Sequence, residues 1–201
     1  MSEDFGLVPT TYESTGVASH GFGDLRMGAT VAADQASTLY ASTNADAVAR
    51  WESLAGNAKA DDGVAALVAS PTIDFGDAGS SYSTTISLAG VTSTANLCGW
   101  IDFNANGTFD NATERTCASP TSGDSVATLT WNVPATVSAS AKYARLRLSF
   151  DSAASNPAGR VSSGEIEDYS FIANVTQTTT VAPTTTVAPT TTVAPTTTVA
   201  P

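Results

Sequence analysis

The sequence predicts an all-β fold, an antiparallel β-sandwich of the jelly-roll or Ig-like kind. Residues 64–175 consist of short runs rich in Val, Ile, Thr, Leu and aromatic residues, and Gly, Pro, Asn or Asp interrupt these runs at short intervals. The run 143–150 alternates between apolar and polar residues, which is the period of a β-strand. Five or more such runs separated by turn residues fit two packed sheets better than a helical fold.

The first part of the chain is less regular. Residues 1–63 are rich in Gly, Ser and Ala, and we expect an irregular N-terminal segment of loops and short strands packed on the sandwich. Residues 45–54 are compatible with a short helix. The sandwich is predicted to span residues 64–176.

Strands are predicted for residues 83–89, 95–103, 125–133, 143–150 and 168–175. In the fourth of these, Ala144, Leu146, Leu148 and Phe150 are expected to face the core, whereas Tyr143, Arg145, Arg147 and Ser149 form the polar face of a half-buried strand. In the last strand, Tyr169, Phe171, Ala173 and Val175 are expected to point inward.

Residues 177–201 form a different kind of segment. The unit Thr-Thr-Thr-Val-Ala-Pro occurs four times between Thr178 and Pro201, without a charged or aromatic residue. Such a sequence cannot build a core, and its regular prolines favour an extended, disordered, polyproline-like chain. Thr/Pro tracts of this kind are typical of O-glycosylated stalks, and a linker without glycans is the alternative.

The charge balance limits the class of partner. Acidic residues outnumber basic ones 19 to 8, which gives a net charge of −11 and argues against nucleic acid as a partner. No run approaches the ~20 apolar residues that a membrane helix requires, so we expect no membrane insertion in this segment. The first residues lack the basic and apolar regions of a signal peptide, which we expect to be missing from this chain.

The chain has two cysteines, Cys98 and Cys117. If the strand 97–103 and a strand after Glu114 form a hairpin, residues whose numbers sum to 215 face each other, and the two sulfurs lie across the ladder. We therefore predict a disulfide, with two free buried thiols as the alternative. A disulfide favours an oxidising, extracellular compartment.

Residues 100–110 predict a loop that binds a hard cation. Asp102, Asn104 and Asn106 offer side-chain oxygens at every second position before Gly107 turns the chain, which is a pattern typical of calcium sites. The predicted ligands are Asp102, Asn104, Asn106, the carbonyl of Thr108, and Asp110 or Glu114 as the closing carboxylate.

This loop is not an EF-hand, because its twelfth position is Thr113 and not the required Glu. The alternative to a calcium site is an Asx-rich turn whose side chains cap their own backbone. Glycosylation sequons begin at Asn106, Asn111 and Asn174, and glycans at the first two would compete with a metal ion.

Residues 163–169 form an acidic turn in which Glu165, Glu167 and Asp168 lie within four positions. Like charges this close repel each other unless a cation compensates them. One candidate is a second calcium ion, in a site that also takes Asp61 and Asp62, and the other is Arg145 with Arg147 on a neighbouring strand. A structural role in fastening the last strand explains the acidic residues equally well.

Catalysis is not predicted. His20 is the only histidine, and nothing near it in the sequence would orient it as a base, so a packing or surface role is expected. Trp51, Trp100 and Trp131 are candidates for stacking on sugar rings, although the last two lie within strand patterns and are expected in the core. We expect a protein that is not an enzyme.

These motifs together resemble the GEVED domain of bacterial secreted and surface proteins, a family named for its acidic signature. The resembling segments are Gly164 to Tyr169, Trp100 to Asn104, Tyr143 to Ser149, Asp61 to Val64, Asp4 to Gly6, Tyr12, His20, and Met27 with Gly28. The chain departs from the family pattern at residues 47–51, where an acid-rich stretch is expected. The resemblance implies parts of large adhesin-like proteins and no known catalytic activity.

The expected function is that of a calcium-stabilised, non-catalytic module for adhesion or assembly, secreted to the bacterial cell surface and presented on a Thr/Pro stalk. Its expected partners are cell-surface or matrix proteins, glycans, or further copies of itself. The alternatives are a carbohydrate-binding module of a secreted hydrolase and a subunit of an extracellular filament.

Overall fold

The computed structural model describes residues 3–6, 8–13, 15–21, 23–29, 72–140 and 143–176, and these ranges are built mainly from β-strands. In chain order the elements are β1 (Glu3–Phe5), η1 (Thr10–Glu13), β2 (Ser19–Gly21), β3 (Arg26–Met27), β4 (Thr72–Asp77), β5 (Ser81–Ala89), β6 (Asn96–Ile101), β7 (Arg115–Ala118), β8 (Val126–Asn132), β9 (Tyr143–Ser149), η3 (Ser152–Ser155), β10 (Arg160–Val161), β11 (Glu165–Ser170) and β12 (Ile172–Thr176). The predicted all-β fold is confirmed.

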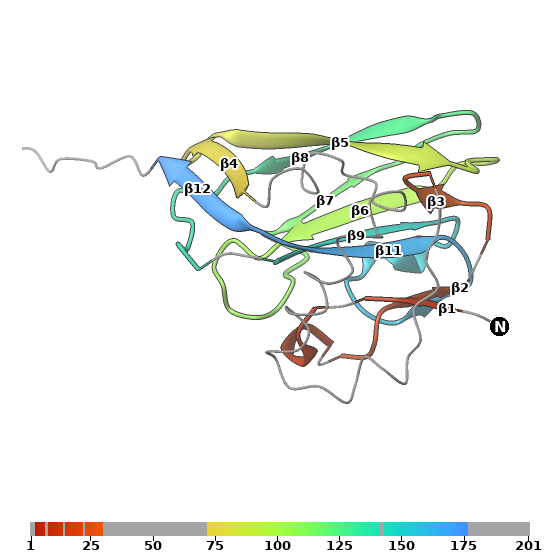
Figure 1. Ribbon diagram of the computed structural model, residues 1–201, viewed down its shortest axis with the longest axis horizontal. Coiled ribbons are helices and arrows are strands. Elements are labelled where there is room, and N and C mark those ends of the chain that lie inside the picture. Colours follow the sequence, from red (N-terminus) through yellow and green to blue (C-terminus); the bar gives the residue numbers. More distant parts are fainter. Residues whose placement is uncertain are drawn as a thin grey trace, which may run out of the picture.

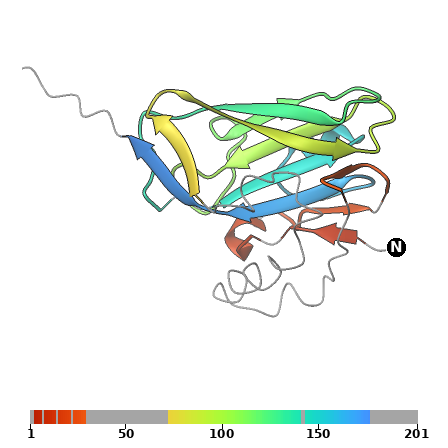
Figure 2. The ribbon, with the colours of Figure 1, turned by 45° about the horizontal axis from the view of Figure 1, so that its top comes forward.

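Two sheets form the sandwich. One has the strand order β11-β9-β6-β7 and is antiparallel throughout, and the other has the order β3-β5-β8. Figure 1 shows β5 and β8 above β6, β9 and β11, with β4 and β12 paired at one end, and the turned view of Figure 2 shows the same layers. A small third sheet, β1-β2-β10, lies beneath β11 on the side away from β5.

Apolar side chains fill the space between the two main sheets. Ile86 and Leu129 come from the upper sheet, and Leu97, Leu146 and Leu148 come from the lower sheet, all of them buried. Trp100 and Trp131 are buried as well, as their strand patterns predicted. Each buried leucine or isoleucine side chain stabilises the fold by about 1.5–3 kcal/mol relative to an exposed one.

The predicted register of the hairpin is confirmed. β6 and β7 pair so that Leu97 faces Ala118, Cys98 faces Cys117 and Trp100 faces Arg115. The predicted last strand is confirmed in its inward face but not in its continuity. Tyr169 and Phe171 are buried and Ala173 and Val175 pack against the core, but the strand is divided at Phe171 into β11, which pairs with β9, and β12, which pairs in parallel with β4.

Strand β9 corrects one prediction. Its side chains alternate as expected, but the strand is not half-buried, because all seven residues from Tyr143 to Ser149 are buried. The third layer, formed by the N-terminal segment and β10, lies on its polar face. Phe150 was expected in the core and is instead 36% exposed, because β9 ends before it, at Ser149.

Other predictions concern residues outside the described ranges. These are the short helix at 45–54, Trp51, Asp61, Asp62 and the stalk at 177–201, so the proposed boundaries of the sandwich stay predictions. Within the described ranges, no helix has the length and apolar character needed to cross a lipid bilayer.

Gly164 fixes the turn that leads into β11. Its φ is +91°, and a Cβ placed on it would lie 1.8 Å from the carbonyl oxygen of Leu148 in β9. A side chain is therefore excluded twice, by the backbone conformation and by the neighbouring strand. The acidic signature begins with a glycine because only glycine fits this close to β9.

We expect Gly164→Ala to destabilise the protein by roughly 4 kcal/mol or more, since it adds a clash with backbone to the cost of a positive φ. Gly123 is a matched control, because its φ is +92° and a Cβ there would meet nothing within 4 Å. Gly123→Ala should cost only about 1–2 kcal/mol. Urea unfolding of the two variants measures both values, and equal losses would contradict the close approach at Gly164.

Candidate cation loop and the acidic strand

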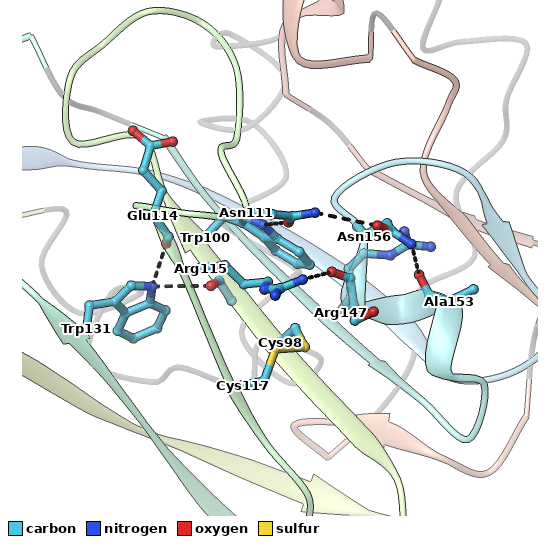
Figure 3. The surroundings of a disulfide bond; sticks show 12 residues. Cys98, Trp100, Asn111, Glu114, Arg115, Cys117, Trp131, Arg147, Ala153 and Asn156 are labelled. Carbon is cyan, nitrogen blue, oxygen red and sulfur yellow. Dashed lines mark hydrogen bonds between the residues drawn. A yellow bond between two sulfur atoms is a disulfide. The ribbon is translucent and has the colours of Figure 1, made fainter.

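The loop between β6 and β7 rises from a stem closed by a disulfide (Figure 3). Cys98 and Cys117 are joined directly across the two strands, with an S–S distance of 2.04 Å, and this confirms the predicted pairing. Cys98 is buried and Cys117 is exposed. The bond holds together the two strands from which residues 102–114 project.

Asp102 is the centre of the loop and is 1% exposed. Its Oδ2 accepts hydrogen bonds from the Tyr12 hydroxyl at 2.5 Å and from the Gly107 N–H at 3.1 Å, and its Oδ1 accepts from the Asn106 N–H at 3.2 Å. A carboxylate has about four lone-pair positions, so one position is left on Asp102 for a further partner. Burial, followed by this hydrogen bond, raises the pKa of Tyr12.

Asn104 and Asn106 form consecutive Asx turns. The Asn104 Oδ1 accepts from the Asn106 N–H at 2.9 Å, and the Asn106 Oδ1 accepts from the N–H and the hydroxyl of Thr108 at 2.9 and 2.7 Å. Ala105 has a φ of +57° and Gly107 a φ of +80°, so two left-handed residues tighten the loop. The capping role foreseen as the alternative to cation binding is therefore present in the loop.

Glu114 is the last residue of the loop, directly before β7, and is 1% exposed. Its Oε2 accepts from the Asp110 N–H at 2.9 Å, whereas its Oε1 is the one buried side-chain oxygen or nitrogen in the described residues that has no hydrogen-bond partner. Burial, together with the charges of Asp102 and Asp110, raises the pKa of Glu114 to about 7. In Figure 3 the Glu114 carboxylate points away from Trp131 and the disulfide.

The predicted ligands of the loop differ in what they offer. Asp102 and Glu114 are buried carboxylates, and the charge of Asp102 helps to raise the pKa of Glu114, whereas Asp110 is exposed and its Oδ1 accepts from the Ala112 N–H at 2.6 Å. Thr108 is exposed. Since no three acidic, His or Cys side chains gather into a metal cluster within the described residues, a cation here would also require amide and carbonyl oxygens.

On the acidic strand β11, Asp168 forms a bidentate ion pair with Arg145 of β9. The Arg145 Nε lies 2.8 Å from Oδ1 and its Nη2 lies 2.9 Å from Oδ2, and Asp168 also accepts from the Val8 N–H at 3.0 Å. Arg145 further binds Glu13 at 2.5 Å and the Pro157 carbonyl at 2.6 Å. Of the two compensating cations foreseen for Asp168, the structure shows arginine.

The other acidic residues bind backbone N–H groups or a neighbouring hydroxyl. Glu165 accepts from the Met27 N–H in β3, and Glu167 accepts from the Tyr169 hydroxyl. In the opposite direction, Asp4 of β1 accepts from the Ile166 N–H of β11 at 2.7 Å. The acidic signature thus has a structural role, as foreseen, but it fastens the N-terminal segment to β11, whereas the sequence predicted that it fastens the last strand.

Arg147 and His20 form a second buried pair. The Arg147 Nε donates to the His20 Nε2 at 2.9 Å, and the His20 Nδ1 lies 3.0 Å from the Ser163 carbonyl, so the neutral ring carries its proton on Nδ1. Arg147 also donates to the carbonyls of Asn156, Ala158 and Gly159. His20 is a packing histidine, as expected.

Burial and these contacts shift several pKa values. Burial lowers the pKa of Arg145, but the Asp168 and Glu13 carboxylates outweigh it and the net shift is upward. Burial and the charge of Arg145 lower the pKa of Arg147 to about 10. Burial, followed by the charge of Arg147, lowers the pKa of His20 well below 6.5. Both arginines are charged at neutral pH and His20 is neutral.

The sequence predicted no role for Tyr12, Glu13 or Asp4, which join the N-terminal segment to the two sites. Tyr12 packs against Phe109 and Tyr143 with ring centroids 4.6 and 5.5 Å apart. Asp4 and Tyr12 belong to motifs of the family resemblance, and that was the available signal. Glu13 gave none, because its partner Arg145 is 132 residues away.

Comparison with known families locates the match in the lower sheet and its loops. Residues 96–172 match the family model described as the GEVED domain, and this confirms the predicted resemblance over that range. The range includes the candidate cation loop of residues 102–114, both buried arginines and the acidic strand. A search of curated proteins found no match to the chain.

We expect Asp168→Asn to cost about 3 kcal/mol of folding free energy, because it removes one charge of a buried pair and leaves Arg145 partly uncompensated. The matched control is Asp74→Asn. Asp74 is exposed and accepts a single N–H bond, from Gly76, so its change should cost less than about 1 kcal/mol. Urea unfolding measures both, and losses of similar size would contradict a special role for the Arg145 pair.

The lowered pKa of His20 predicts a pH dependence with a definite sign. Below about pH 6.5 His20 is protonated in the unfolded chain but stays neutral in the folded chain. The contribution of His20 to the free energy of unfolding is therefore fully present above that pH and falls as the pH falls. Well below pH 6.5, the free energy of unfolding should fall by about 1.4 kcal/mol per pH unit because of this one group. His20→Gln keeps an acceptor for Arg147 and removes the titration.

Urea unfolding of the two proteins between about pH 5 and 8 gives the comparison, since 6.5 lies inside this window. The difference in unfolding free energy should shrink as the pH falls. Glu114 has a raised pKa, so its contribution to stability changes with pH in the direction opposite to that of His20. This contribution is the same in both proteins and cancels when the unfolding free energy of the variant is subtracted from that of the wild type. Parallel curves would show that His20 does not titrate as inferred.

Proposed function

We propose that this chain is a non-catalytic extracellular module, stabilised by calcium, that serves cell-surface adhesion or structural assembly on a Thr/Pro stalk. The main support for the proposal is the buried carboxylate of Glu114. Glu114 has a buried oxygen without a hydrogen-bond partner, the charge of the buried Asp102 contributes to the raised pKa of Glu114, and two desolvated carboxylates that repel each other favour a cation.

Calcium suits the oxygen types in this loop. Asp102 and Glu114 would supply charge, and Asn104, Asn106 and the Thr108 carbonyl would supply neutral oxygens, toward the 6–8 that calcium prefers. The Asx turns do not exclude this, because a carbonyl oxygen has two lone pairs and can cap an N–H while it binds a cation. With few carboxylates we expect weak binding, in the range of roughly 10⁻⁴ to 10⁻³ M found for extracellular modules.

The cation would make the module rigid. Calcium would supply the positive charge that the two buried carboxylates require. Residues bonded to the loop would then hold it in one conformation. The disulfide holds the stem of the loop, and the Tyr12 hydroxyl connects Asp102 to the N-terminal segment. A loop fixed at both ends can present a constant surface to a partner.

The disulfide supports a secreted location, since such bonds persist in oxidising compartments and Cys117 is open to solvent reductants. The partners that we propose are cell-surface or matrix proteins, glycans or further copies of the chain. Sedimentation of the full chain in calcium and in chelator distinguishes self-assembly from binding to a different component.

The alternative of a carbohydrate-binding module receives less support. Trp100 and Trp131 are 0% and 4% exposed, and their indole N–H groups donate to Asn111 and to the carbonyls of Gly99 and Glu114. Neither ring is free to stack on a sugar. That alternative therefore depends on Trp51, which lies outside the described residues.

We expect calcium to raise the melting temperature of the full chain. For a Kd of about 10⁻³ M and calcium at about 10 mM, linkage gives about 1.4 kcal/mol, which is a shift of a few degrees. Glu114→Gln keeps the acceptor for Asp110 and removes the charge, so most of the shift should disappear. Differential scanning calorimetry in calcium and in chelator measures it.

Asp124→Asn is the matched control. Asp124 is an exposed loop carboxylate that accepts from the N–H and hydroxyl of Thr121, and it lies in a different turn from the cation loop. Its variant should retain the whole calcium shift. If wild type shows no shift, or if both variants lose it equally, the calcium proposal is wrong.

A further inference from the structure

The cation loop contains the sequence Asn106-Gly107, which is the only Asn-Gly pair in the chain. The Asn106 side chain is exposed, whereas Gly107 is partly buried within the turn. In such a pair the backbone nitrogen of the glycine can attack the side-chain amide carbon of the asparagine, because no Cβ on the glycine obstructs the approach. The sequence makes the reaction possible, and the structure places hydrogen-bonding groups at both reacting atoms.

The first is a pair of donors on the amide oxygen. Attack on Cγ of Asn106 places negative charge on Oδ1, and Oδ1 already accepts from the Thr108 N–H at 2.9 Å and from the Thr108 hydroxyl at 2.7 Å. Two donors aimed at an oxygen where charge develops are an oxyanion hole. Hydrogen bonds that cap the turn would also stabilise the tetrahedral intermediate.

The second is a base at the attacking nitrogen. The Gly107 N–H donates to Oδ2 of Asp102 at 3.1 Å, within the distance at which a carboxylate can take a proton as the nitrogen attacks. Nucleophile, base and oxyanion donors thus come from residues 102–108. None of them must move from a distant part of the chain.

We propose that Asn106 is a site of self-catalysed deamidation. The Gly107 nitrogen bonds to Cγ of Asn106 and gives its proton to Asp102, which returns it to water; the amide nitrogen takes up a proton from water and leaves as ammonia when the Cγ–Nδ2 bond breaks. Water then opens the resulting succinimide. Opening at Cγ yields aspartate, and opening at the main-chain carbonyl yields isoaspartate. The net reaction consumes one water and releases one ammonia.

The products change the loop in different ways. Aspartate adds a carboxylate to the predicted calcium ligands and would strengthen calcium binding. This consequence rests on the proposed function. Isoaspartate adds a methylene to the main chain and breaks the Asx turns. The modification is therefore a slow, irreversible change in the charge and shape of this surface loop.

The test follows deamidation of the intact full chain in chelator at neutral pH, by peptide mapping with mass spectrometry. Asn106 should react several-fold faster in the folded chain than in the same chain unfolded in urea. Thr108→Val removes the hydroxyl donor, keeps the backbone, and should slow the reaction several-fold in the folded chain alone. Thr108→Ser should restore it.

The opposite results would overturn the proposal. A folded rate at or below the rate in urea would show that the loop protects Asn106, and an unchanged rate in Thr108→Val would exclude the oxyanion role. Because Thr108 is exposed, neither substitution should alter folding, and the melting temperature checks this.

A second arm adds calcium and separates this proposal from the proposed function. Calcium on Asp102 and Asn106 would withdraw the base and the amide oxygen, so slower deamidation supports both. An equal rate with calcium, for a chain that deamidates rapidly in chelator, supports the modification and contradicts the calcium site. If calcium stabilises the chain but Asn106 stays intact in chelator, the calcium site is supported and the deamidation proposal is wrong.

Discussion

The buried ion pair between Arg145 and Asp168 is the interaction on which the rest of the structure depends. A guanidinium with no exposed surface is costly unless its donors are satisfied, and here they bind Asp168, Glu13 and the Pro157 carbonyl. These partners come from β11, from the N-terminal segment and from the chain after β9. The N-terminal segment is therefore required by β9, because without it the polar face of that strand would lose both its cover and a carboxylate.

The acidic signature has a similar explanation. β11 is the outer strand of its sheet, and an outer strand leaves backbone N–H groups unpaired. Asp4 accepts one of these, from Ile166, while Asp168 and Glu165 accept from N–H groups of Val8 and Met27 in the N-terminal segment. The Asp4 carboxylate thus satisfies one N–H of this edge, and the carboxylates of β11 hold the N-terminal segment beside it.

The sequence was sufficient for features set by local spacing. Alternation identified β9 and its inward face, and the symmetric cysteines identified the hairpin register. It was insufficient where distant segments meet, because alternation shows that two faces differ and not what covers each. The burial of Arg145 and the lone oxygen of Glu114 both depend on such packing. For the same reason, Asp102, Asn104 and Asn106 were recognised as a loop, while Tyr12 was not recognised as its partner.

The loop of residues 102–114 and the acidic strand are joined through two adjacent residues. In η1, Tyr12 donates to Asp102 of the loop, and Glu13 binds Arg145, whose guanidinium lies 5.5 Å from the ring of Phe109. Because neighbouring residues of one short helix contact both sites, η1 docks fully only when both are in their native arrangement. A ligand or a chemical change that shifts Asp102 would therefore displace the Tyr12 hydroxyl, and the next residue of η1, Glu13, is the one that binds Arg145 beside β11.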